Sequence, residues 1–343
     1  MPATLADVAR RAGVSAATAS RVLNESSYGV TAELRARVVA AADELQYVPN
    51  AHAQALARAS TSTVGVIVHD VSDPYFSEIT RGIQRVASRA GRLVMICNTY
   101  LDLDRELAYV RLLHAQRVEA LIVAGAGYDD RAFSQKLSAQ LGAFTAAGGR
   151  AVLVGRHRVA GDTVVADNTG GARAAAEALI ALGHQRIGVI NGPSLLTTTR
   201  DRLEGFRAML GEAGLSLPQT HIVEADFSRD GGLRATEELI QRAPDLTAIF
   251  ALNDTMAVGA LAALRERGIV VPEEISVVGF DDIPITRDIT PMLSTVHVPM
   301  VEMGVRAMEL ALEPHASEWR FEHFPTTLVL RESTAAITRS GNQ

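Results

Sequence analysis

The chain has 343 residues, 48% of them hydrophobic, which is enough for two or three domains with buried cores. Its formal net charge of −6 argues against a protein that holds nucleic acid by bulk positive charge, and by itself favours a cytosolic enzyme. The single cysteine excludes an intramolecular disulfide, and no apolar run suits a signal peptide or a membrane span. We therefore expect a cytoplasmic protein without a membrane partner.

The first 60 residues have a helical pattern. Residues 5–12 predict a helix that Thr4 caps and Gly13 ends, because glycine supplies the turn. Ser15 caps a second short helix over 16–23, and a third helix at about 32–46 closes a small core. Two helices joined by a glycine turn are typical of a helix-turn-helix, although any three-helix bundle gives this pattern. Six arginines stand against five acidic residues here, so charge gives little support for DNA binding.

A different rhythm begins after the small polar joint at 59–63. Short β-branched runs alternate with amphipathic helical stretches, which predicts βαβ units on two doubly wound, parallel-sheet lobes. Open sheets of this kind bind ligands beyond the carboxyl ends of their strands. Cys97 is expected as a core thiol of a buried strand. The first lobe is expected to take strands at 64–68, 93–97, 120–123 and 151–154, and the second those at 163–166, 186–190, 221–224, 247–251 and 275–280.

The string from Thr4 to Asn24, together with 45–50, is long and specific. It closely resembles the DNA-binding headpiece of the LacI/GalR family of transcriptional repressors. The resemblance implies that the second helix enters the major groove and that Ala16, Ala17 and Arg21 occupy the base-reading positions. Arg21 can reach guanine O6 and N7, whereas the alanines offer only methyl groups to a thymine. The candidate phosphate contacts are Thr4, Ser15, Thr18, Ser20 and Asn24.

Residues 50–58 resemble the hinge helix of the same family, which folds when a dimer meets its operator. The resemblance implies that Leu56 wedges between two central base pairs in the minor groove, with Ala53 facing the same step. Asn50, at the start of the segment, is grouped with them as a DNA contact. An apolar wedge unstacks the base step, and the extra contact with the bent duplex offsets that cost. Helical spacing alone would favour a core role for Leu56, but its place between a helix-turn-helix and a polar joint favours the wedge.

The resemblance continues nearly to the C-terminus and implies a body similar to periplasmic sugar-binding proteins, with an effector between the two lobes. The matching strings are 64–68, 73–76, 183–188, 202–206, 253–254, 276–282, 293–296 and 327–333. The candidate effector contacts are three rings that can stack on a ligand, a guanidinium fork, and polar side chains at strand ends. They are Tyr75, Phe76, Phe227, Arg202, Asn253, Asp281, His69 and Arg156. The aromatic residues could instead be core residues, and Asp281 could be a helix cap.

Three departures from the family pattern bear on the ligand. Gly155 stands where many relatives have an acid, and Val298 stands where many have glutamine. Leu196 matches an arginine of the purine-sensing relative, so a purine is disfavoured. A sugar or polyol suits the remaining set of aspartate, asparagine, arginine and aromatic residues. No cofactor is expected, since the nine histidines show no metal-ligand spacing.

We expect a headpiece over 1–49, a hinge over 50–60, and an effector-binding and dimerisation domain over 61–343. Its first lobe is expected over about 61–161 and 292–324, and its second over about 162–291 and 325–343. The predicted function is a homodimeric, sequence-specific DNA-binding regulator, and a repressor in particular, that binds a near-palindromic double-stranded operator under effector control. The C-terminal residues contain no leucine heptads, so no tetramerising tail is expected.

Two other classes of function compete with this reading. A sugar-binding transport component would suit the body but leaves the headpiece unexplained. A hydrolase or isomerase would use Asp281 with His69, but the sequence shows no nucleophile–base arrangement to support it. We therefore expect no enzymatic activity.

Overall fold

The computed structural model describes residues 3–23, 30–48, 61–314 and 318–337. These fall into a small N-terminal unit that ends at Ser62 and a large unit from Thr63 onward, apart from the turn Ala115–Glu119, which groups with the first. Asn24, Asn50, Ala53 and Leu56, four of the predicted DNA contacts, lie outside the described residues. Within the described ranges, no helix is long and apolar enough to cross a bilayer.

The N-terminal unit is the predicted helix-turn-helix with a third helix. Its described residues form α1 (Leu5–Ala12), α2 (Ala16–Leu23) and α3 (Ala32–Glu44). Thr4 and Asp7 form a capping box at the start of α1, and Gly13 ends that helix with a φ of 64°. The third helix ends slightly earlier than expected, because Gln46 takes a φ of 46° and turns the chain away. The small core that joins the helices contains Val8, Ala9, Ala12, Ala19, Val22, Val38, Ala41 and Ala42.

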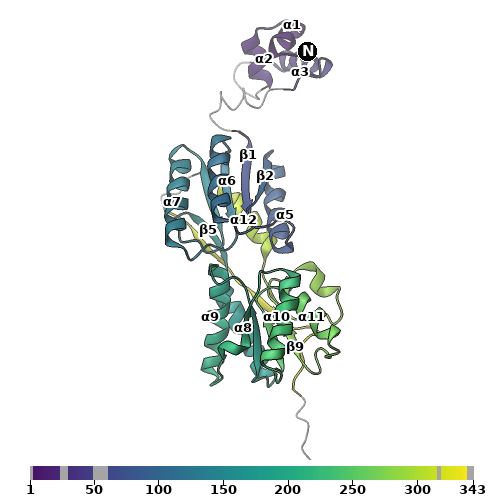
Figure 1. The fold of residues 1–343 in the computed structure, drawn as a ribbon. Coiled ribbons are helices and arrows are strands. Elements are labelled where there is room, and N and C mark those ends of the chain that lie inside the picture. Colours follow the sequence, from purple (N-terminus) through teal and green to yellow (C-terminus); the bar gives the residue numbers. More distant parts are fainter. Residues whose placement is uncertain (1–2, 24–29, 49–60, 315–317, 338–343) are drawn as a thin grey trace, which may run out of the picture. The chain divides into compact units, whose positions relative to one another are not determined.

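The first lobe of the large unit is built on a six-stranded parallel sheet in the order β11-β5-β4-β3-β1-β2 (Figure 1). Its strands are β1 (Thr63–Val68), β2 (Leu93–Asn98), β3 (Ala120–Ala124), β4 (Arg150–Val154), β5 (Asp162–Ala166) and β11 (Phe321–Phe324). Its helices are α5 (Pro74–Arg89), α6 (Leu103–Ala115), α7 (Arg131–Ala146) and α12 (Met300–Leu312). The sequence placed β5 in the second lobe, but β5 pairs with β4 and extends the first sheet. Strand existence follows from local pattern, whereas sheet membership depends on long-range pairing.

Helices α5 and α12 cross at backbone contact distance, and glycine makes this crossing possible. A Cβ added to Gly304 would lie 2.0 Å from the carbonyl oxygen of Ile79, and one added to Gly82 would lie 2.1 Å from that of Val301. Neither position has room for a side chain. The crossing joins the C-terminal segment of the chain to the first lobe.

The second lobe has a four-stranded parallel sheet in the order β7-β6-β8-β9. Its strands are β6 (Ile187–Asn191), β7 (Ile222–Glu224), β8 (Ala248–Ala251) and β9 (Ser276–Val278). Its helices are α8 (Asn168–Ala181), α9 (Thr197–Glu212), α10 (Arg229–Arg242) and α11 (Asp254–Glu266), with short 3₁₀ turns at η1 (Gln219–His221) and η2 (Pro284–Arg287). The predicted class, a helical headpiece followed by two parallel-sheet lobes, is confirmed.

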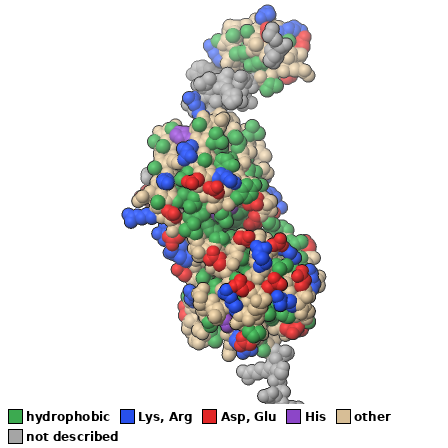
Figure 2. Space-filling view, in the orientation of Figure 1, with side chains coloured by type: hydrophobic (Ala, Val, Ile, Leu, Met, Phe, Trp, Pro, Cys, Tyr) green, Lys and Arg blue, Asp and Glu red, His purple; other side chains and the backbone are tan. Residues whose placement is uncertain are grey.

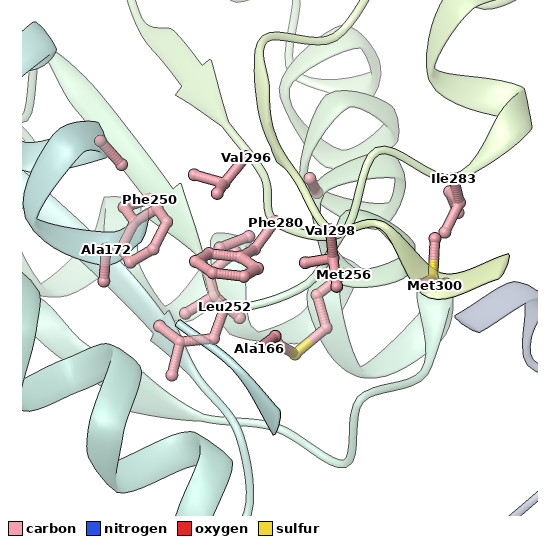
Figure 3. Packing of buried hydrophobic residues seen from close by; sticks show 14 of the residues in the cluster. Ala166, Ala172, Phe250, Leu252, Met256, Phe280, Ile283, Val296, Val298 and Met300 are labelled. Atoms are coloured by element: carbon pink, nitrogen blue, oxygen red, sulfur yellow. The ribbon is translucent and has the colours of Figure 1, made fainter. Parts of the chain in front are cut away.

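The chain crosses between the lobes three times: between β5 and α8, between β9 and α12, and between β11 and β12 (Thr327–Val329). The second and third crossings pair with each other, because β10 (Thr295–His297) lies antiparallel to β12. Figure 3 shows that Phe280, Val296 and Val298 of the second crossing pack beside buried residues of the second lobe such as Phe250 and Met256. The crossing segments therefore share the core of the second lobe.

Strand β2 differs from its expected place in the core. It lies at the edge of the first sheet and is largely exposed, with Leu93 73% and Met95 44% exposed. Cys97 is only half-buried, so the prediction of a core thiol was wrong. A run of apolar residues is typical of a buried strand, but it also occurs in a strand that another molecule covers. Figure 2 shows hydrophobic side chains gathered on one face of the first lobe.

Candidate functional site

The helix α2 presents an exposed face in the N-terminal unit. Ala16, Ala17 and Arg21 are exposed, whereas Ala19 and Val22 are buried against the other helices. The other predicted contacts that the structure describes lie at the same helix or at the start of α1: Thr4 and Ser15 are exposed, and Thr18 and Ser20 are half-buried. The hydroxyl of Ser15 accepts a hydrogen bond from the amide of Thr18 at 3.1 Å, so Ser15 is also the expected cap.

A cavity lies between the lobes, at the carboxyl ends of the strands of both sheets. The first lobe contributes residues that follow β1 and β3 or begin α5, and the second contributes the start of α9 and residues that follow β7, β8 and β9. The lining residues are His69, Asp73, Tyr75, Phe76, Ala126, Leu196, Thr198, Arg202, Phe227, Asn253 and Asp281.

Arg202 is the central polar residue of this cavity and is 3% exposed. Its Nε donates to Oδ1 of Asn168 at 2.9 Å, and one terminal nitrogen donates to Oδ1 of Asp281 at 2.8 Å. The other terminal nitrogen donates to the carbonyl oxygen of Leu252. Its guanidinium carbon lies 3.7 Å from the ring centroid of Phe280, a cation–π contact. The fork is therefore held rigidly in place by protein groups alone.

Asp281 enters the cavity from a left-handed turn. It has a φ of 116°, and Asp282 has a φ of 57°, values that residues with a Cβ rarely take. The turn is held by Asp254, which accepts from the amide of Ile283 at 2.9 Å, and by Arg331, which donates to Asp282 at 2.6 Å. Burial raises the pKa of Asp281, and the nearby Arg202 acts against this shift. A strained turn fixed by buried charges is typical of a ligand-binding position.

The walls of the cavity are aromatic. The rings of Tyr75 and Phe76 meet edge to face with centroids 5.1 Å apart, and His69 lies 5.3 Å from Phe76. Burial lowers the pKa of His69 to about 3, so its imidazole is neutral at physiological pH. Phe227 has a φ of 63°, and its ring lies against the backbone of Gly192, where a Cβ would come within 2.3 Å of the ring.

The cavity brings together seven of the eight residues predicted to contact an effector. Arg156 is the exception, because it does not line the cavity and pairs instead with Asp201. Three further lining residues, Asp73, Ala126 and Thr198, were not predicted from the sequence, and Leu196 was noted there only as a departure from the family pattern. Asp73 precedes Pro74 at the start of α5, where an aspartate is expected as a helix cap. Its sequence position is therefore explained by capping, and nothing in it indicates a place in the cavity.

His69 and Asp281 lie on opposite lobes, and the partner that the structure gives Asp281 is Arg202. Across the described ranges, the histidine, cysteine and acidic side chains form no group of three that could hold a metal ion. The lining residues thus supply hydrogen bonds and ring surfaces, which are the means of recognising a small polar molecule.

A helix-turn-helix unit followed by two parallel-sheet lobes, with a polar and aromatic cavity between them, defines a DNA-binding regulator that a small molecule controls. Residues 4–50 match the lacI family of bacterial regulatory proteins, and residues 176–334 match a periplasmic binding protein-like domain. The HTH-type transcriptional regulator GalS of Salmonella typhimurium is 41% identical over 97% of this chain and 96% of its own length. The chain belongs to the lacI family of transcriptional regulators.

Two solved structures resemble the whole chain. The lac repressor dimer bound to operator and the anti-inducer ONPF superposes with a TM-score of 0.85 and 31% identity, covering 98% of this chain and 100% of that one. The complex of the transcriptional regulator CelR with cellobiose gives a TM-score of 0.70 and 32% identity, covering 96% and 99%. The chain is thus a DNA-binding transcriptional regulator whose activity depends on an effector.

Proposed function

We propose that this protein is a cytoplasmic repressor that binds a near-palindromic operator as a homodimer and responds to a sugar or polyol in the cavity between its lobes. The observation that carries the proposal is the buried set of Arg202, Asp281 and Asn253 beside aromatic walls. Paired donors and acceptors suit vicinal hydroxyl groups, and the rings suit the apolar face of a sugar. A relative is solved with cellobiose, which supports a sugar as the ligand class.

A purine is a poorer candidate for the same cavity. Leu196 is 1% exposed and lines the cavity, so it offers an apolar surface where a purine would need hydrogen-bond partners for its ring edges. The cavity is also proposed to be a binding site without catalysis. Burial lowers the pKa of His69 to about 3, which makes its imidazole a weak base, and Asp281 is engaged by Arg202, so neither residue is suited to activate a nucleophile.

Different regions of the chain carry the two proposed binding functions. We assign operator binding to 1–49 together with a hinge over 50–60, and effector binding and dimerisation to 61–343. Ala16, Ala17 and Arg21 are the proposed base contacts, because they form the exposed face of α2. Thr4, Ser15, Thr18 and Ser20 are the proposed phosphate contacts. The hinge contacts Asn50, Ala53 and Leu56, and Asn24, remain proposals from the sequence.

The proposal is tested by selecting binding sites from a pool of random duplex DNA with the purified full-length protein. Selections are run without effector and with D-galactose, D-ribose, cellobiose or a polyol. Enrichment of a two-fold-related site supports operator binding, and a sugar that removes or strengthens the enrichment identifies both the effector and its sign. If no sequence is enriched under any condition, the regulator proposal fails at its DNA-binding step.

Substituting Arg21 tests the base-reading face. Arg21→Ala is expected to cost about 1–3 kcal/mol of operator affinity and to relax preference at one base pair in each half-site. Arg21→Lys keeps the charge but lacks the planar fork, so it should lose the base preference while keeping more affinity. Arg10→Ala is the matched control, because Arg10 is 78% exposed on α1 and its loss removes the same charge. Operator and random DNA affinities measured by fluorescence anisotropy decide the matter, and equal losses on both would contradict base reading.

The exposed apolar residues of β2 and α6 are the proposed dimer surface. Leu93, Met95 and Leu112 are each more than 40% exposed, at 73%, 44% and 51%, and the lac repressor relative is a dimer. Leu93→Arg is expected to shift the protein to monomers in sedimentation velocity at micromolar concentration. Leu330→Arg is the matched control, since Leu330 is 51% exposed but lies after β12. If Leu93→Arg dimerises with the same dissociation constant as Leu330→Arg, the assignment of the dimer surface is wrong.

A further inference from the structure

The two lobes are joined by a row of direct contacts beside the cavity, here called the seam. It consists of residues 127–129, Arg156 and Arg158 on the first lobe and residues 195–201 on the second. The amide of Asp129 donates to the carbonyl oxygen of Leu195 at 2.8 Å, and the amide of Thr197 donates to that of Gly127, also at 2.8 Å. These two bonds form an antiparallel bridge around Tyr128 and Leu196.

Charged side chains reinforce this bridge. Nε of Arg156 donates to Oδ2 of Asp201 at 2.8 Å, and a terminal nitrogen of Arg156 donates to the other oxygen, so the pair has two parallel bonds. Asp129 pairs with Arg158 at 2.6 Å within the first lobe and with Arg200 across the seam. The side chains of Arg156 and Asp201 are 32% and 16% exposed, so water screens this pair only in part.

The seam is continuous in sequence with the wall of the cavity. Ala126, Leu196 and Thr198 line the cavity and are direct neighbours of the bonded residues. The hydroxyl of Thr197 donates to the carbonyl oxygen of Arg156 at 2.7 Å, so Arg156 takes part through its backbone as well as its side chain. The side chain of Arg156 is held by Asp201 without any ligand. The seam therefore fixes the separation of the lobes at the cavity wall.

We propose that Arg156 is a positioning residue that holds the cleft closed through Asp201 and does not itself contact the effector. The inference rests on the proposed effector site, since it concerns how that cleft is kept shut. Closing contacts that form in the free protein pre-organise the cavity, and opening of the seam separates its two walls. The two parallel hydrogen bonds between Arg156 and Asp201 set the frequency of that opening, because bidentate pairs of arginine and carboxylate are strong side-chain contacts.

Amide hydrogen exchange on the full-length protein without any sugar tests the proposal directly. The amides of Asp129 and Thr197 bond across the seam, so their exchange rates report its opening. We expect both to be protected in the parent protein and to exchange roughly five- to tenfold faster in Arg156→Gln. Arg156→Lys keeps the charge but makes a single bond, so it should restore much of the protection. Amides of β6, in the core of the second lobe, should not change.

Arg186→Gln is the matched control, because Arg186 pairs with Asp245 at 3.1 Å on the second lobe away from the seam. It should leave Asp129 and Thr197 unaffected. The proposal is overturned if these two amides already exchange at the rate of free loops in the parent, or if Arg156→Gln and Arg186→Gln behave alike. A general rise that includes β6 would show loss of structure, and the comparison of Arg156→Lys with Arg156→Gln would then decide. Because no sugar is used, failure to find an effector leaves this result intact.

Discussion

Replacing Arg202 by methionine is expected to weaken effector binding by about 30- to 5,000-fold, which corresponds to about 2–5 kcal/mol. The guanidinium is 3% exposed and bonds Asn168, Asp281 and the carbonyl of Leu252 at once. Methionine fills a similar volume but leaves the carboxylate of Asp281 buried without its cation. The measurement is isothermal titration of the full-length variant with the sugar found in the selection. Operator affinity without effector should stay within about twofold of the parent, because α2 lies in the other unit.

Arg207→Met is the matched control for this experiment. Arg207 lies on the same helix, α9, but is exposed, so its loss removes the same charge without touching the cavity. A double variant with Asp281→Asn tests the coupling. If Arg202 acts through Asp281, the two changes together should cost clearly less than the sum of the single losses. An Arg202→Met protein that binds the sugar as tightly as Arg207→Met would remove Arg202 from the site.

Local pattern and the resemblance together predicted most elements and most cavity residues. His69, Asn253 and Asp281 each follow a strand, and the rule that ligands bind at carboxyl ends was sufficient to group them. The same rule failed for Arg156, which also follows a strand. Its partner, Asp201, lies 45 positions later on the other lobe, and only packing brings the two together. A contact that depends on lobe separation leaves no mark in local sequence.

Burial of single side chains was also out of reach of the sequence. Leu93 and Met95 lie in an apolar run yet are exposed, because β2 is an edge strand. Glu106 is the opposite case, because an acidic residue in the first turn of a helix interacts favourably with the helix dipole and is usually exposed. It is instead 2% exposed. In both cases the exposure of the side chain depends on which elements pack against it in the fold, and not on the periodicity of the sequence.

The burial of Glu106 has a consequence for stability. Its Oε1 is buried without a hydrogen-bond partner, and its carboxyl interacts electrostatically with the buried hydroxyl of Tyr128. Burial raises the pKa of Glu106 to about 8. The folded protein therefore keeps this carboxyl protonated over a pH range in which the unfolded chain has already ionised it. Folding holds the proton more tightly, so the free energy of unfolding should fall as pH rises.

Glu106→Gln is expected to be more stable than the parent at pH 8 by roughly 3–5 kcal/mol and nearly equal to it at pH 4.5. Glutamine keeps the shape of the protonated acid but has no charge to bury.

The experiment compares the free energies of unfolding of the two proteins at each pH. The absolute value for one protein is not sufficient, because His69 and His157 change the stability with pH in the direction opposite to Glu106. Burial lowers their pKa values to about 3 and about 4, so their contribution to stability grows as pH rises through the ordinary histidine range. Urea denaturation at pH 4.5, 6.5 and 8, followed by circular dichroism, measures this difference, with Glu302→Gln on the exposed face of α12 as control. Parallel pH curves for the parent and Glu106→Gln would mean that Glu106 is ionised in the folded protein and has a partner there.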